Sequence, residues 1–259
     1  MFAFEGTVII FLIGMAAGTI GSIIGIGGGI VIAPVLTLVG FTPSQIASTS
    51  LIAVTSTSVS SVIEYTRQKR IKYKIGLKMA CFSVPGAVIG AFISSEISPS
   101  VFRAYFALLL AVASIYIYYK NSVVSKKKNK KIRPIILYLI FYSGAASAGI
   151  VSSLFGIGGG IVFVPMLVIL FEMGMAYAAP TSQLTLLITS ISGVISHLII
   201  SLPDYNFAVV LAIGSFVGGQ IGARFSTRLQ ENVLNKLLSL SLIIVAIKFV
   251  FDYLYHEFP

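Results

Sequence analysis

Charged residues are scarce in this chain, which has 18 Lys and Arg and only 8 Asp and Glu among its 259 residues. Soluble globular domains carry roughly a quarter charged residues, and less than half of their residues are apolar. Here 10% of the residues are charged and 57% are hydrophobic, so the chain cannot cover itself with a surface suited to water. The composition predicts an integral membrane protein and excludes most classes of soluble enzyme.

Residues that form disulfides or bind metals are almost absent. The single cysteine, Cys81, excludes an intramolecular disulfide and a cysteine-based metal cluster. The two histidines, His197 and His256, lie far apart and lack the spacing of a zinc motif. The apolar segments hold almost no groups for nucleophilic or acid–base chemistry. We therefore expect a protein that is not an enzyme and has no catalytic residues, metal or cofactor.

Long apolar runs divide the chain, and most are long enough to cross a membrane as helices of about 20 residues. They cover residues 7–24, 30–40, 43–64, 79–95, 102–119, 135–155, 161–174, 177–200, 206–223 and 233–254. Open strands are excluded because lipid cannot satisfy their backbone groups, and a barrel would need short alternating segments. The first run follows no basic residue, so we expect it to stay in the mature protein rather than be cleaved as a signal peptide. The runs predict an all-α, multi-pass protein of the cell (plasma) membrane.

An internal repeat organises these runs. The segment Gly25-Ile26-Gly27-Gly28-Gly29-Ile30-Val31 recurs as Gly156-Ile157-Gly158-Gly159-Gly160-Ile161-Val162, and Pro34 recurs at the same spacing as Pro165. Further on, Thr49-Ser50-Leu51 aligns with Ser182-Gln183-Leu184, and Gly86 with Gly90-Ala91 aligns with Gly218 and Gly222-Ala223. We predict two transmembrane repeats, residues 1–120 and 135–259, joined by a basic linker at 121–134. Each repeat has about four spans and opens with a helical hairpin that is broken at glycines.

Basic residues predict how the repeats are oriented, because they concentrate in cytoplasmic loops. One basic loop spans residues 67–78, and another spans residues 120–133. If the two short segments fold back as hairpins, the halves have inverted topology with a pseudo-two-fold axis. All basic residues except Arg103 and Lys248 then lie inside, and both termini lie outside. Parallel halves leave more basic residues outside, so we expect the inverted arrangement. The basic loops should attract anionic lipid, and they offer no element that could read nucleic acid.

The glycine clusters are the predicted binding site. A run of glycines is costly within a helix, about 1 kcal/mol per residue relative to alanine, and corresponding glycine breaks in two repeats are typical of transporter sites. Helices that begin at Ile30 and Ile161 would direct free N–H groups and the positive end of the helix dipole at an anion. Close helix packing is the alternative explanation for the glycines. The candidate residues are Gly25, Gly27, Gly28, Gly29, Gly156, Gly158, Gly159 and Gly160.

Hydroxyl groups are the second set of candidates, because no Lys or Arg lies at the centre of an apolar run. They lie on the runs that follow the short segments, at Ser48, Thr49, Ser50, Thr55 and Ser58 and at Thr181, Ser182, Gln183, Thr185, Thr189 and Ser192. Hydroxyls and amides can donate hydrogen bonds to an anion, although Ser and Thr also bond to their own helix. The matched pairs Thr49-Ser50 and Ser182-Gln183 are the predicted substrate-binding residues.

Two ionisable residues, Glu64 and His197, fall at corresponding positions of the two repeats. An ionisable group at membrane depth suggests a function, and either residue could carry a coupling proton. Each also has a simpler explanation. Glu64 is close enough in sequence to Arg67 to form a surface ion pair, and His197 comes shortly before Leu202-Pro203-Asp204, where water could reach it.

These motifs together resemble the sulfite exporter TauE/SafE family along essentially the whole chain. The resemblance rests on the paired Gly-Ile-Gly-Gly-Gly-Ile-Val segments with their downstream prolines, on the Gly-x-x-x-Gly-Ala of each half and on the basic central loop. It implies a transporter that exports a small sulfur-containing anion, such as sulfite or an organosulfonate like sulfoacetate. Inverted halves that rock about a midplane site would give alternating access. An importer or channel for another oxyanion or a carboxylate is the alternative, and a non-transporting membrane scaffold is a further one.

Overall fold

The computed structural model describes residues 2–98, 101–102, 104–105, 134–200 and 203–228, and every element within them is an α-helix. The helices are α1 (Phe2–Ile24), α2 (Gly29–Val39), α3 (Pro43–Arg67), α4 (Tyr73–Glu96), α6 (Pro134–Phe155), α7 (Gly160–Leu170), α8 (Met175–Ile200) and α9 (Tyr205–Phe225). Six of them, all except α2 and α7, are long and apolar enough to cross a membrane. The predicted all-α membrane architecture is thus confirmed. The expected linker up to residue 133, most of the run 102–119 and the run 233–254 lie outside the described residues.

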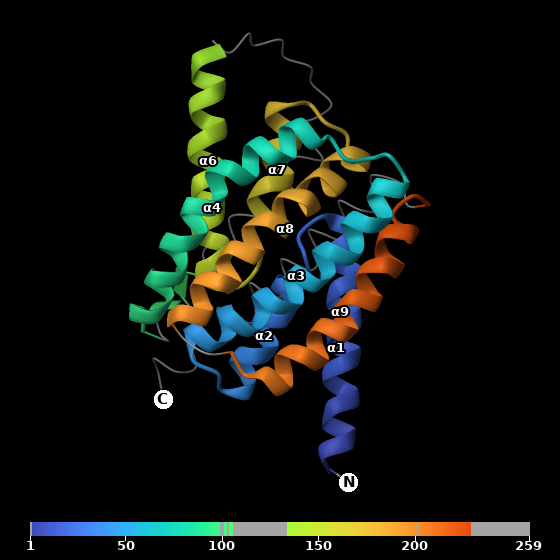
Figure 1. Ribbon diagram of the computed structural model, residues 1–259, viewed down its shortest axis with the longest axis vertical. Helices are drawn as coiled ribbons and strands as arrows, with labels where there is room; N and C mark the ends of the chain where they lie inside the picture. Colours follow the sequence, from blue (N-terminus) through green and yellow to red (C-terminus); the bar gives the residue numbers. More distant parts are fainter. Residues whose placement is uncertain (1, 99–100, 103, 106–133, 201–202, 229–259) are drawn as a thin grey trace.

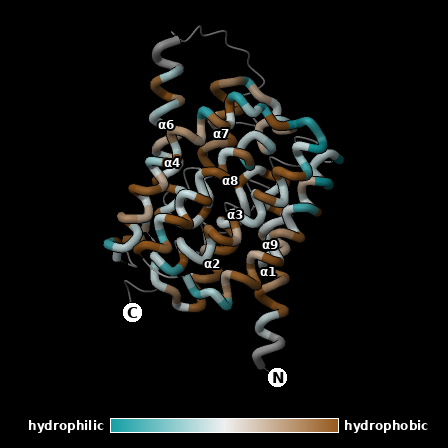
Figure 2. The backbone as a smooth tube through the Cα atoms, viewed as in Figure 1, coloured by the Kyte–Doolittle hydropathy of each residue, from teal (hydrophilic) through white to brown (hydrophobic). Residues whose placement is uncertain are grey.

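The two short helices each return toward the end from which the preceding long helix came (Figure 1). Helix α1 rises from the N-terminal end of the molecule and α2 turns back, whereas α6 descends from the opposite end and α7 turns back. The loop between α3 and α4 and the end of α9 lie toward the end at which α6 begins. Figure 2 shows the hydrophilic residues of the chain mainly at these two ends, with apolar helices between them.

Local sequence signals set the ends of the helices. Thr42 caps α3 in a capping box with Gln45, and Pro43 occupies the first helical turn, where its missing N–H costs nothing. Asp204 caps α9 by accepting hydrogen bonds from the first backbone N–H groups of that helix. Helix α2 ends at Gly40, which has a φ of 90° and bonds back to the last carbonyls. These signals fix where the polypeptide re-enters the bundle.

Glycines let helices of the two halves pack closely, α4 against α6 and α9 against α1. A Cβ on any glycine of the two Gly-x-x-x-Gly motifs would collide with a backbone carbonyl of the facing helix. The pairs are Gly86 with Ala146, Gly90 with Ile150, Gly218 with Met15 and Gly222 with Thr19. These motifs therefore serve close packing. Each half thus places its last described helix against the first helix of the other half.

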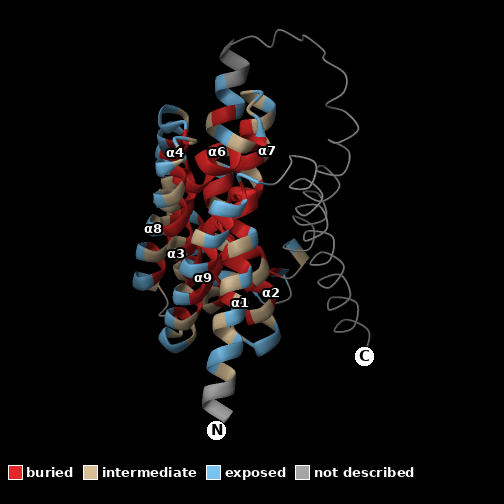
Figure 3. Ribbon diagram, turned by 90° about the vertical axis from the view of Figure 1, so that its right-hand side faces the viewer, coloured by how far each residue is buried: buried red, intermediate tan, exposed pale blue. Residues whose placement is uncertain are grey.

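Burial is greatest where these helices cross, in the middle of the bundle (Figure 3). Helix α2 and the end of α1 contribute Ile24, Ile30, Ile32 and Leu36 to one apolar cluster, which also contains Ile161 of α7. Large apolar side chains cover the outer faces of the helices as well, for example Ile199, which is 81% exposed. An apolar exterior around a buried interior is what a lipid environment favours. The interior is where the glycine loops lie.

Candidate functional site

The two glycine loops lie against each other in the buried interior. A Cβ on Gly29, the first residue of α2, would collide with the carbonyl of Gly156, and one on Gly160 would stand 2.5 Å from the carbonyl of Gly25. All the glycines predicted for the site are buried in these two loops and at the starts of α2 and α7. The structure therefore brings together two segments that lie half a chain apart.

Glycine is required where each short helix begins. Gly28 and Gly159 occupy the N-cap positions with φ of 87° and 72°, a left-handed conformation that strains any residue with a Cβ. Neither cap offers a side chain to the helix, although Ser, Thr, Asp or Asn would ordinarily satisfy a first-turn N–H there. The short helices begin at Gly29 and Gly160, one residue earlier than the sequence indicated.

Unpaired donors result at both helix starts. Within the described chain, no acceptor is found for the backbone N–H of Gly29 and Ile30 in α2, or of Gly160 and Ile161 in α7. The first N–H groups of any helix lack an intrahelical partner, and here the protein supplies no substitute. Such N–H groups, at the positive end of the helix dipole, are suited to bind an anion.

Two serines hold the loops from the opposite half of the chain. The hydroxyl of Ser50 on α3 donates to the carbonyl of Gly156 at 2.6 Å, and that of Ser182 on α8 donates to Gly25 at 2.7 Å. All four residues are buried. Both serines therefore lie at the predicted site. In this conformation both hydroxyls donate their hydrogen bonds to loop carbonyls and not to a ligand. The two side chains therefore position the glycines.

Gln183 and Thr49, the other members of the predicted pairs, differ in their contacts. The amide of Gln183 donates from Nε2 to the carbonyl of Gly21 at 2.8 Å, next to the first loop, and its Oε1 accepts from Ser58 at 3.0 Å. Thr49 instead accepts at Oγ1 from the backbone N–H of Asp204, at the start of α9. Gln183 thus adjoins a glycine loop, whereas the Thr49 hydroxyl is bonded to the connection between α8 and α9.

Most of the remaining candidate hydroxyls bond within their own helices. The donors to carbonyls three or four residues earlier are Ser48, Thr55, Thr185 and Thr189. This is the common behaviour of Ser and Thr in helices. Thr185 also donates to the carbonyl of Gly76, and the hydroxyls of Thr189 and Ser83 bond to each other, so two of these side chains also join α8 to α4. The four hydroxyls contribute little free hydrogen-bonding capacity to the site.

His197 is fully buried on α8, with Nε2 2.9 Å from the carbonyl of Ser153 near the end of α6. The expectation that water surrounds it is therefore wrong.

A similar contact occurs in the first half, where the hydroxyl of Tyr65 donates to the carbonyl of Ser22 at 2.8 Å. Ser22 and Ser153 each lie three residues before the first glycine of their loop. By contact, the counterpart of His197 is Tyr65 and not Glu64. The sequence alone does not match Tyr65 with His197, because Tyr and His share little chemical likeness.

Glu64 forms the ion pair with Arg67 that its spacing indicated, at 3.9 Å, and a shorter one with Arg224 at 3.4 Å. Its carboxylate also accepts hydrogen bonds from Gln68 and Gln220. The carboxylate thereby joins α3 of one half to α9 of the other, at the end of the molecule where the basic loop lies. Glu64 is not in contact with the glycine loops.

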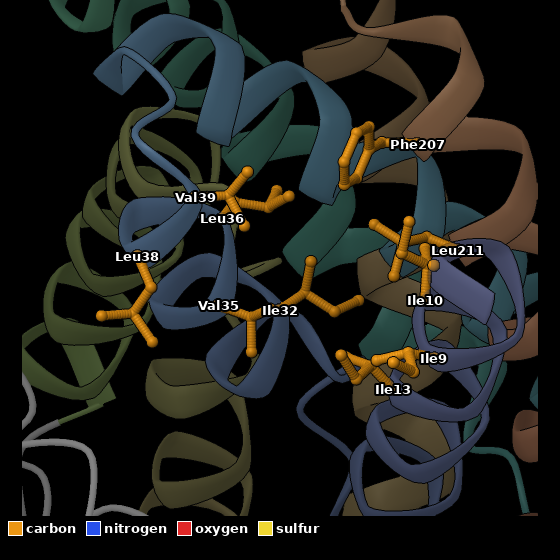
Figure 4. Close-up of a pocket in the computed structure, with 11 residues that line it drawn as sticks. Ile9, Ile10, Ile13, Ile32, Val35, Leu36, Leu38, Val39, Phe207 and Leu211 are labelled. Carbon is orange, nitrogen blue, oxygen red and sulfur yellow. The ribbon is translucent and has the colours of Figure 1, made fainter. Parts of the chain in front are cut away.

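An apolar groove of about 360 Å³ lies beside α1, α2 and α9 (Figure 4). Its lining comprises Gly6, Ile9, Ile10, Ile13, Ile32, Val35, Leu36, Leu38, Val39, Phe207 and Leu211. No glycine of the two loops is among these residues. A groove without polar side chains cannot replace the hydration of an anion, so the glycine loops are the better candidate for an anion site.

Comparison with known proteins identifies the relatives of this chain. The family model described as sulfite exporter TauE/SafE matches residues 10–249. The chain is 31% identical to the probable membrane transporter protein YunE of Bacillus subtilis, over 95% of this chain and 97% of that protein. It is 25% identical to the probable membrane transporter protein ORF9 of Sinorhizobium sp, over 96% of this chain and 94% of that protein. No solved structure matches the chain significantly.

Proposed function

We propose, since the chain belongs to the sulfite exporter TauE/SafE family of membrane transporters, that it exports a small sulfur-containing anion across the plasma membrane. Sulfite, or an organosulfonate such as sulfoacetate, is the proposed cargo. The observation that carries this proposal is the set of unpaired N–H groups at the starts of α2 and α7. Backbone donors at the start of a helix suit a small oxyanion, whose oxygens accept several hydrogen bonds at once.

The two glycine loops form the proposed site, and Ser50, Ser182 and Gln183 hold these loops in place. The hydroxyl of Thr49, one residue before Ser50, completes the proposed set. In this conformation the loops are buried and packed on each other. An anion can therefore enter or leave only when the loops are exposed by a movement of the helices around them.

The two halves are proposed to be inverted repeats. Support comes from contacts that occur in pairs: the two serine bonds to the loops, the bonds of Tyr65 and His197, and the glycine packing of α4 on α6 and of α9 on α1. The opposite directions of α1 and α6 in Figure 1 agree with this proposal. Inverted halves provide two structurally equivalent states, open to either side, which is the basis of alternating access.

Export needs no coupled ion. With the cell interior negative, an anion gains about 2.3 kcal/mol per charge per 100 mV when it leaves. A carrier that exposes the glycine loops alternately to each side would let sulfite leave down this gradient. Uptake against the same potential would require a coupling ion, and His197, which is buried next to the second loop, is the proposed proton carrier in preference to Glu64.

Binding to the purified full-length chain tests the cargo. We expect sulfite or sulfoacetate to raise the melting temperature in detergent, and sulfate, thiosulfate, taurine and simple carboxylates serve as comparison ligands. Stabilisation by carboxylates alone would refute the sulfur assignment.

Transport in proteoliposomes tests the mechanism. A carrier loaded with unlabelled sulfite should accelerate the entry of labelled sulfite from the other side, because each half-cycle returns a loaded site. A channel shows no such acceleration. Imposing a membrane potential should drive sulfite toward the positive side, and equal rates in both directions would contradict export driven by the potential.

A further inference from the structure

The N–H groups at the beginning of the first glycine loop share one acceptor. The carbonyl of Gly21, four residues before the loop, accepts from the backbone N–H groups of Gly25, Ile26 and Gly27 at 3.0, 2.8 and 3.1 Å. It also accepts from Nε2 of Gln183 at 2.8 Å. Four donors thus converge on one carbonyl, which closes the loop into a tight turn. Little hydrogen-bonding capacity is left around this loop except at the start of α2.

The second glycine loop lacks this closure. The N–H groups of Gly156, Ile157 and Gly158 make no comparable bonds to backbone carbonyls within the described chain. The residue four positions before this loop is Ser152 in place of Gly21. The Ser152 hydroxyl is fully buried and has no hydrogen-bond partner. The two loops therefore match in backbone path but differ in unused donors.

Ser152 lies beside the start of α7. Its Cβ is 3.1 Å from the point where a Cβ on Gly159, the N-cap residue, would stand. The Ser152 side chain therefore begins next to the helix end whose N–H groups also lack acceptors. The neighbouring Ser153 has an unpaired buried hydroxyl too, 3.2 Å from the Cβ position of Gly193 on α8.

His197 adds a further unpaired atom on the same side. A carbonyl cannot donate, so Nε2 of His197 must be the donor to Ser153. Nδ1 of the same ring is buried without a partner. Of the four unpaired buried side-chain atoms in the described chain, three belong to Ser152, Ser153 and His197, and the fourth belongs to Ser61.

Unpaired buried polar atoms are destabilising, and native structures contain few of them unless water, an ion or a ligand completes them. We propose that the two loops have different roles, with the anion bound at the second loop only. There the anion accepts hydrogen bonds from the first-turn N–H groups of α7 and from the Ser152 hydroxyl, while Ser153 and His197 line the adjoining wall. The first loop, closed on Gly21, is the structural partner. This assignment rests on the proposed transport of a small oxyanion.

The test is Ser152→Ala in the full-length protein, with sulfite as the probe. We expect the Kd for sulfite to rise about tenfold, because one hydrogen bond to a charged ligand is lost. The melting temperature without ligand should stay the same or rise, because the substitution removes an unpaired buried hydroxyl. A lower melting temperature without ligand, together with an unchanged Kd, would show that Ser152 is structural and overturn the proposal.

Ser22→Ala is the matched control, because Ser22 occupies the position of Ser153 in the first half and its hydroxyl already donates to Thr19 at 3.1 Å. We expect this variant to bind sulfite as the wild type does, whereas Ser153→Ala weakens binding. Equal losses in both variants would mean that the two loops bind alike and would overturn the proposal.

Anion binding by the wild type and by Ser152→Ala shows which of the two proposals fails, the different roles of the loops or the sulfur-containing cargo. If the wild type binds sulfite and Ser152→Ala binds it equally well, the asymmetry fails while the proposed function stands. If the wild type binds only carboxylates and Ser152→Ala loses them, the asymmetry stands while the sulfur assignment fails. Absence of binding for every anion overturns both.

Discussion

The hydroxyl of Ser182 donates a 2.7 Å hydrogen bond to the carbonyl of Gly25, and both residues are buried. The bond joins α8 of the second half to the glycine loop of the first. Ser50 makes the reverse connection to Gly156 at 2.6 Å. The loops are therefore held by the half of the chain to which they do not belong, and any movement that separates the halves must break these bonds.

Ser182→Ala and Ser50→Ala should each destabilise the protein. Each substitution leaves a buried carbonyl with one hydrogen bond fewer, which costs about 1–3 kcal/mol. We expect lower melting temperatures in detergent for both variants. Ser95→Ala is the control, because the Ser95 hydroxyl is exposed and bonds only within its own helix. A melting temperature for Ser182→Ala equal to that of the control would show that the bond contributes nothing.

Gly29→Ala and Gly160→Ala should disrupt the contact between the loops. The added methyl group would collide with the backbone of the other loop, at Gly156 and Gly25, and overpacking of this kind costs about 1–3 kcal/mol. We expect both variants to lose sulfite transport in proteoliposomes. Gly6→Ala is the control, because nothing lies within 4 Å of its Cβ position. Normal transport by Gly160→Ala would argue against a site formed by the packed loops.

Much of the fold could be predicted from the sequence, because the apolar runs and the helix signals are local. The observed ends of α3 and α8 lie within a few residues of the runs 43–64 and 177–200. The repeated glycines also marked where the short helices begin. Local patterns suffice here because a membrane helix must satisfy its own backbone within one segment.

The pairing of side chains between the halves could not be predicted. Ser50 and Ser182 were identified as site residues, but their partners on the opposite loops follow only from how the halves pack. The match of Tyr65 with His197 was hidden because the two side chains differ and only their acceptors, Ser22 and Ser153, are alike. Such contacts depend on tertiary geometry that a repeat alignment does not contain.

Glu64 and His197 should respond differently in a test of proton coupling. The Glu64 carboxylate is bound by Arg224 and by two glutamines near the molecular surface, so we expect Glu64→Gln to leave the pH dependence of transport unchanged. His197 is sealed from water next to the second loop. If His197 carries the coupling proton, His197→Gln should flatten the pH dependence of transport measured between about pH 5 and 8. Sulfite flux measured over this range decides, and unchanged profiles for both variants would exclude them as proton carriers.

Inverted and parallel halves place two connections on opposite sides of the membrane. With inverted halves, Glu172 between α7 and α8 lies inside and Asn206 at the start of α9 lies outside, whereas parallel halves reverse both positions. Glu172 and Asn206 are exposed, so a cysteine at either site can react. The exposed Cys81 is first replaced by serine. We expect a membrane-impermeant maleimide to label Asn206→Cys in intact cells and Glu172→Cys only after lysis, because basic residues stay on the cytoplasmic side. Labelling of Glu172→Cys in intact cells would contradict the inverted arrangement, and with it the two equivalent states that alternating access requires.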